Sequence, residues 1–197
     1  MTLRRRIARW LLLDLWGWRI EGPIPYDTPK CVVAVYPHTS NWDFPIGVLF
    51  RPAFGIDIHF AGKDSLFRPP LGGLMRWLGG RPVVRSRRTN FVEAVAEIFR
   101  RNEVFRLCLT PEGTRGRVEK LRSGYHYIAL EADVPIVFCA FHWAERTMRW
   151  SEPFRVTEDY DRTLRAFHSF FRGTIGFHPA DAYPIPPATA DASAAAS

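Results

Sequence analysis

The sequence lacks the features that would assign it at once to several large classes of protein. It has only three cysteines, Cys31, Cys108 and Cys139, and no C-x-x-C or H-x3-H spacing typical of a zinc site. Each cysteine lies within an apolar run, as buried thiols of a reducing compartment do. No apolar stretch approaches the roughly 18 residues that a membrane-spanning helix needs, and no internal repeat is visible. We therefore expect neither a structural metal nor a transmembrane helix.

The overall composition is that of an ordinary globular domain with an excess of positive charge. Among 197 residues, 47% are hydrophobic and 24% are charged, which favours one domain with a substantial core. The 27 basic residues outnumber the 20 acidic ones and give a formal charge of +7. This charge indicates an anionic partner, which composition alone leaves open as nucleic acid, a phosphorylated small molecule or an acidic membrane surface.

The N-terminal segment has the composition of a helix that lies at a membrane surface. Residues 3–20 contain five arginines and three tryptophans but a single acid, Asp14. On a helical wheel the apolar side chains gather on one side, namely Leu3, Ile7, Trp10, Leu11, Leu15 and Trp18. A signal peptide is disfavoured, because Asp14 interrupts the apolar core and no cleavage site follows. We predict an amphipathic interfacial helix over residues 1–20, with packing against its own domain as the alternative.

The periodicity of the remaining chain predicts a single α/β domain over residues 21–178. Short apolar runs predict strands at 31–36, 56–60, 82–85, 105–109 and 135–141. Helical patterns fall at 70–78, 91–101, 123–132 and 159–172, and a further helix is expected to begin near Trp42. This alternation favours a mostly parallel central sheet flanked by helices. Residues 179–197 are rich in Pro, Ala and Ser, so we expect a flexible tail there.

His38 and Asp43 follow directly after the apolar run 31–35 and could form a catalytic pair. A carboxylate that accepts the Nδ1 proton of a histidine leaves Nε2 free to act as a base toward an alcohol or thiol. The residues between them also suit a helix-capping loop with an ordinary surface histidine. The pair taken alone is therefore weak evidence for catalysis.

A second polar loop, 110–116, follows the strand predicted at 105–109. Parallel strands present their carboxyl ends at one edge of the sheet, which is where α/β proteins bind ligands. Gly113 lets backbone amides approach an anion closely, and Arg115 can hold a phosphate through two hydrogen bonds. Lys63 and Arg85 end other short strands, so we expect them at the same edge. These residues indicate a site for an anionic ligand.

The order of these motifs resembles that of the glycerolipid acyltransferase family, which includes bacterial 1-acylglycerol-3-phosphate acyltransferases. His38 to Asp43 matches the H-x4-D block of the family, and 63–85 is similar to its K-x-x-L-F…P…G…G…R block. Residues 111–115 match P-E-G-T-R, and 134–137 match V-P-I-V. Family members commonly have Asn before the histidine and Phe before P-E-G-T-R, where this chain has Pro and Thr. Four blocks in the same order are far more specific than any one block.

The resemblance implies a glycerol-3-phosphate acyltransferase-like fold and transfer of a fatty acyl group to a hydroxyl of a lysophospholipid or glycerol phosphate. The donor would be a thioester, acyl-CoA or acyl carrier protein, and no metal or other cofactor is implied. His38 would be the general base and Asp43 would orient it. The acceptor would be bound by Lys63, Arg85, Glu112, Gly113, Thr114 and Arg115. Such an enzyme is expected to lie peripherally on the anionic, cytoplasmic face of the membrane and to bind no nucleic acid.

Three other functions remain open from the sequence. A thioesterase or hydrolase could use the same His-Asp pair with water as the acceptor. A metal-dependent hydrolase could recruit His38, Asp43, His59 and His142, although their spacing matches no known ligand pattern. A non-catalytic basic protein that binds membranes or nucleic acid would explain the charge, but it leaves the four ordered motifs unexplained.

Overall fold

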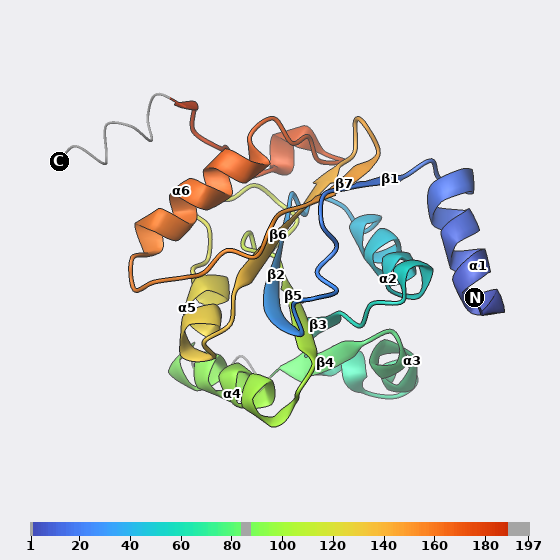
Figure 1. The fold of residues 1–197 in the computed structure, drawn as a ribbon, viewed down its shortest axis with the longest axis horizontal. Coiled ribbons are helices and arrows are strands. Elements are labelled where there is room, and N and C mark those ends of the chain that lie inside the picture. The colour runs from blue at the N-terminus through green and yellow to red at the C-terminus, as the bar shows by residue number, and fades with distance from the viewer. Residues whose placement is uncertain (1, 84–87, 189–197) are drawn as a thin grey trace.

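The computed structural model describes residues 2–83 and 88–188, and within them a seven-stranded sheet is flanked by helices on both faces (Figure 1). The strands are β1 (Arg19–Glu21), β2 (Lys30–Tyr36), β3 (His59–Lys63), β4 (Gly80–Val83), β5 (Phe105–Leu109), β6 (Ile136–His142) and β7 (Thr147–Trp150). Their order in the sheet is β1-β7-β6-β2-β5-β3-β4. The five strands from β6 to β4 are parallel, whereas β7 runs antiparallel to β6 and pairs in parallel with β1. The predicted α/β class with a mostly parallel sheet is confirmed.

The helices form two layers, one on each face of the sheet. They are α1 (Leu3–Arg9), a π-helical continuation (Trp10–Leu15), α2 (Asp43–Phe54), α3 (Gly72–Trp77), α4 (Arg88–Arg101), α5 (Gly124–Glu131) and α6 (Tyr160–Phe171). In Figure 1, α4, α5 and α6 lie on one side of the sheet, and α1 and α2 lie on the other. Each layer has its own hydrophobic core. The continuous apolar run of β2 follows from this arrangement, because Val32 faces the first core and Val33 the second.

The structure differs from the sequence prediction mainly at the edges of the sheet. Strands β3 and β4 begin three residues later and two residues earlier than predicted, at His59 and Gly80. Ile56 and Ile58 are buried without belonging to a strand, so their apolar character extended the predicted β3 too early. Strands β1 and β7 were not predicted, because each is short and contains charged residues. Neither provides the apolar run that marks an interior strand.

The N-terminal segment is only partly the predicted helix. The helical residues end at Leu15, and Arg19–Glu21 instead form β1, paired with Thr147–Arg149. Ala8 and Leu12 are buried against the layer that contains α2. The wider apolar face identified on the helical wheel is largely exposed, including Leu3, Ile7, Trp10 and Leu15. Among the described residues, no helix has the combination of length and apolarity that crossing a bilayer requires.

The C-terminal segment also departs from the prediction of a flexible tail over 179–197. Pro179–Asp181 form a 3-10 turn, and the ring of Tyr183 stacks on His168 of α6. The backbone of Tyr183 bonds to Glu112 and to the hydroxyl of Tyr36. The composition of this segment indicated that it had little to bury, but the ring and backbone of Tyr183 hold it against the domain. The part of the predicted tail at 189–197 lies outside the described residues.

The burial of the N-terminal helix predicts different effects for two neighbouring leucines. Leu12 is fully buried, whereas Leu15 is 55% exposed in the same helical segment. Leu12→Ala should lower the free energy of unfolding by about 2–5 kcal/mol, because it removes packed methyl groups and leaves a cavity. Leu15→Ala is the matched control and should change it by less than about 0.5 kcal/mol. Urea unfolding of both variants measures the difference, and equal effects would contradict the observed helix orientation.

Candidate active site

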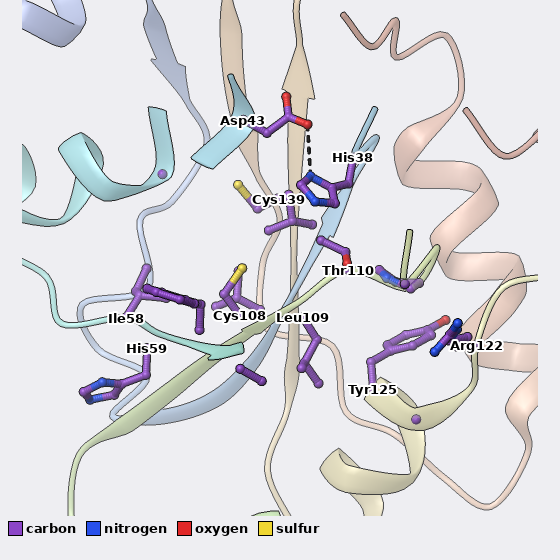
Figure 2. A pocket seen from close by; sticks show the side chains of 18 of the residues that line it. His38, Asp43, Ile58, His59, Cys108, Leu109, Thr110, Arg122, Tyr125 and Cys139 are labelled. Atoms are coloured by element: carbon purple, nitrogen blue, oxygen red, sulfur yellow. Dashed lines mark hydrogen bonds and ion pairs between the residues drawn. The ribbon is translucent and has the colours of Figure 1, made fainter. Parts of the chain in front are cut away.

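His38 and Asp43 form a hydrogen-bonded pair in the loop that connects β2 to α2. His38 Nδ1 lies 3.0 Å from Asp43 Oδ2, and Asp43 is the first residue of α2. The Asp43 side chain is buried, whereas that of His38 is 19% exposed. A carboxylate accepts hydrogen bonds, so Nδ1 carries the proton and Nε2 is the basic nitrogen. Figure 2 shows the pair at one end of the cavity described below.

The buried Asp43 carboxylate receives two further hydrogen bonds. The Ser40 amide donates to Oδ2 at 3.0 Å, and the Trp143 indole Nε1 donates to Oδ1 at 2.7 Å. Both oxygens are therefore satisfied by donors from the loop itself and from the residue that follows β6. A buried carboxylate without such partners would be costly, so these bonds hold the carboxylate in one orientation.

Glu112 is buried beside this pair and connects three segments of the chain. Its Oε2 accepts the backbone amide of His38 at 2.6 Å, and its Oε1 accepts the amide of Tyr183 at 3.0 Å. Burial raises the pKa of the Glu112 carboxyl above its ordinary value, while the two amide donors oppose this rise. Because both oxygens bond to backbone amides, Glu112 positions the loop that carries His38. The predicted contact of Glu112 with an acceptor does not agree with this geometry.

The loop after β5 brings three cations to the same end of the sheet. The cavity described in the next paragraph is lined by all three, which are Arg115, Lys120 and Arg122. Among the described residues, no ion pair involves any of them. Gly113 has a φ of +67°, and a Cβ there would lie 2.5 Å from Arg122 Nε. Only glycine allows Arg122 to cross the loop this closely. These three cations make this end of the cavity suitable for binding an anionic group.

The cavity itself is large and mostly apolar, and it is lined by the central strands, by α2 and by the first residues of α5, with Phe91 and Val92 of α4. Its volume is about 1390 Å³. One face of α2 lines it with Phe44, Gly47 and Val48, at the spacing of successive helical turns. On the sheet side it is lined by apolar residues of the central strands, such as Val33 of β2 and Phe141 of β6. His38 lies at the carboxyl ends of the strands and His59 at the amino end of β3, so the cavity extends along the strands (Figure 2).

Two cysteines also line the cavity, but their environment makes them poor nucleophiles. Burial raises the pKa of the Cys108 thiol to about 12. Burial also raises the pKa of Cys139 well above its ordinary value. A thiol must ionise to attack a carbonyl, so neither sulfur is available as a thiolate near neutral pH. The candidate reactive group of this cavity is therefore His38.

The structure brings together some of the predicted site residues and separates others. His38, Asp43, Gly113 and Arg115 line the cavity, whereas Thr114 is exposed and does not line it. Lys63 ends β3 at the same edge of the sheet as His38. Arg85 lies outside the described residues.

The four residues considered for a metal do not form one cluster. His59 contacts Asp57 at 3.2 Å and the carbonyl of Gly79 at 3.2 Å, at the amino end of β3. His142 lies nearest to Glu145, at 3.8 Å. Neither contacts the pair of His38 and Asp43 in the described part of the chain.

Several residues of the site were missed by sequence reasoning. Trp143 and Tyr183 follow no motif, and they reach the site only because β6 neighbours β2 and the chain returns after α6. Arg122 belongs to none of the matched motifs, yet it lines the cavity. Its close contact with Gly113 could have been suspected, since glycine in a polar loop often marks a close approach.

Comparisons with known proteins agree with this architecture. A comparison with curated proteins gives no match. Among solved structures, the crystal structure of the 1-acyl-sn-glycerophosphate (LPA) acyltransferase PlsC from Thermotoga maritima is similar, with a TM-score of 0.56 and 17% sequence identity. The similarity covers 85% of this chain and 74% of that chain. A family model described as Acyltransferase matches residues 19–142, which is more than half of the sequence. The chain therefore belongs to the acyltransferase family.

Proposed function

We propose that the protein transfers a fatty acyl group from a thioester donor to a hydroxyl of a lysophospholipid or glycerol phosphate. One observation carries this proposal: the His38–Asp43 pair lies at one end of a long apolar cavity that is also lined by Arg115, Lys120 and Arg122. A fatty chain fits an apolar cavity, a phosphate fits the cations, and the base lies between them. Family membership supports acyl transfer, and the geometry supports this class of acceptor.

His38 is the proposed general base of the reaction. Its Nε2 removes the proton of the acceptor hydroxyl as the oxygen attacks the thioester carbonyl. The tetrahedral intermediate then collapses, the carbon–sulfur bond breaks, and the imidazolium returns its proton to the leaving thiolate. Asp43 holds the Nδ1 proton throughout and stabilises the imidazolium. The products are an ester and a free thiol, and no covalent acyl-enzyme is required.

The proposed acceptor site is the mouth formed by the loop after β5. Arg115 and Arg122 neutralise the phosphate of the acceptor, with Lys120 beside them. Lys63, at the end of β3, remains a proposed contributor, as does Arg85. Gly113 has no side chain that could bind the substrate, and its role is to let the loop lie close to Arg122. The donor is acyl-CoA or acyl carrier protein, so we propose that the enzyme acts on the cytoplasmic side of a membrane.

We further propose that the N-terminal helix contacts an anionic membrane surface. Leu3, Ile7 and Trp10 are exposed on α1 and the helical turn that follows it, among several arginines. The guanidinium of Arg4 lies 4.8 Å from the ring centre of Trp77, which places the exposed apolar end of α3 beside α1. Apolar side chains with interspersed cations are typical of surfaces that bind anionic bilayers.

Replacement of His38 tests the chemical step. His38→Ala should lower kcat/KM for acyl transfer by about 10²- to 10⁴-fold, the usual contribution of a positioned base. His178→Ala is a control with an exposed imidazole and should retain wild-type rates. Transfer and free fatty acid release are measured in parallel with acyl-CoA and acyl carrier protein. A folded His38→Ala enzyme with normal transfer would rule out the base, and fatty acid release without transfer would indicate a thioesterase.

Removal of single cations tests the acceptor site. Arg115→Ala and Arg122→Ala should each raise KM for a lysophosphatidate acceptor about tenfold or more, because a charged hydrogen bond to phosphate is lost. The effect should disappear with a monoacylglycerol, which has no phosphate. Arg117→Ala is the matched control, since Arg117 pairs with Glu119 at 3.1 Å on the same loop and does not line the cavity. Equal losses with both acceptors would place the phosphate elsewhere.

The proposed membrane surface is best tested by point substitutions. Deleting the whole N-terminal segment would also remove Leu12 and Trp18, which are buried in the core. The double variant Ile7→Ser/Trp10→Ser should bind vesicles that contain phosphatidylglycerol about tenfold more weakly or worse, because it removes exposed apolar contacts. Val104→Ser, at an exposed valine outside the helices, is the control. Vesicle co-sedimentation measures the binding, and unchanged binding of the double variant would contradict the proposed surface.

A further inference from the structure

Trp143 makes a direct contact with the catalytic carboxylate from outside the recognised motifs. It is the residue immediately after β6, and its indole Nε1 donates to Asp43 Oδ1 at 2.7 Å. The other oxygen, Oδ2, receives His38 Nδ1 and the Ser40 amide, each at 3.0 Å. The two oxygens of Asp43 are thus bonded by different segments of the chain. The family match ends at residue 142, so this contact lies just beyond the matched segment.

The surroundings of Trp143 fix its indole ring. The ring packs edge-to-face against Trp18, with centroids 5.1 Å apart, and against Phe177, with centroids 4.8 Å apart. Its backbone amide donates to the carbonyl of Ile175 at 2.8 Å. Trp18 precedes β1, whereas Ile175 and Phe177 follow α6, so residues near both ends of the domain hold the same side chain. An indole packed in this way presents its N–H in one direction.

A fixed donor on Oδ1 limits rotation of the Asp43 carboxylate. If that group turned, Oδ2 would move away from His38 Nδ1 and from the Ser40 amide. The imidazole would then lose the acceptor that selects its tautomer and orients Nε2. From this geometry we propose that Trp143 is a positioning residue of the reaction, acting on His38 through Asp43. The proposal rests on the proposed role of His38 as the base.

The proposed role predicts a particular kinetic effect for loss of the indole N–H. Trp143→Phe should lower kcat by about 10- to 100-fold, the effect of losing one hydrogen bond to a charged group, and leave KM within about twofold. Thermal unfolding checks that the variant is folded. If Trp143→Phe does not fold, benzothienylalanine incorporated at position 143 keeps the ring shape, lacks the N–H and should give the same loss.

A double-mutant cycle with Asp43→Ala separates positioning from a general structural effect. Without the carboxylate the indole has nothing to orient, so Trp143→Phe should cost less than about twofold further in the Asp43→Ala background. Equal losses in the two backgrounds would overturn the proposal, as would a higher KM with unchanged kcat. Failure of this cycle in an enzyme that still depends on His38 would leave the proposed function intact. If acyl transfer did not depend on His38 at all, both the proposed function and the proposed role of Trp143 would be wrong.

A spectroscopic measurement tests the same inference without turnover. Nitrogen NMR of the His38 imidazole should show the tautomer with a proton on Nδ1 in the wild type and a mixture of tautomers in Trp143→Phe. Trp150→Phe is the matched control, because its buried Nε1 has no hydrogen-bond partner among the described residues. Trp150 also lines the cavity, so its replacement could change the activity, and only the His38 tautomer is compared. In Trp150→Phe this tautomer should be the same as in the wild type. An unchanged tautomer in Trp143→Phe would contradict the proposal.

Discussion

The burial of strand β2 on both faces is the constraint on which the rest of the structure depends. Its side chains alternate between two hydrophobic cores, and both of its edges are paired, with β5 and with β6. A strand placed in this way cannot shift its register without exposing one set of side chains. Consequently the carboxyl ends of β2, β5 and β6 are fixed relative to one another. One of these three strands ends directly before the loop of His38, one before the loop that carries Arg115, and one before Trp143.

Two buried carboxylates convert this strand arrangement into an ordered site. Asp43 and Glu112 are both removed from solvent, and each accepts at least one hydrogen bond from a distant part of the chain. The cost of leaving a buried carboxylate unpaired is large, so the loops that supply the donors are held in place. The polar interior therefore has an organising role, whereas the cavity next to it is lined mostly by apolar side chains, as the proposed fatty acyl substrate requires.

The sequence was sufficient for the strands in the middle of the sheet and for the hydrogen-bonded pairing of His38 with Asp43, because both depend on local patterns. The limits of β5 and the loop that joins His38 to Asp43 follow from an apolar run and its neighbouring polar residues. Residues whose role depends on distant contacts could not be predicted. Trp143 lies 100 residues from its partner Asp43, and no local spacing indicates that contact. Glu112 lay in a recognised motif, yet its burial between two backbone amides depends on how the chain returns after α6.

The hydrogen bonds of Tyr183 have a consequence for the order in which the protein becomes functional. The carbonyl of this residue accepts the hydroxyl of Tyr36, which is 147 positions earlier in the chain. A nascent chain on the ribosome therefore already contains β2 and both of its partner strands before the segment that completes the Glu112 bridge has been synthesised. Contacts between such distant residues also form late in folding, because closing a long loop is entropically costly. The apolar surface of α1 is thus synthesised before β2, whereas the loop of His38 receives its last support only after Tyr183 has been added to the chain.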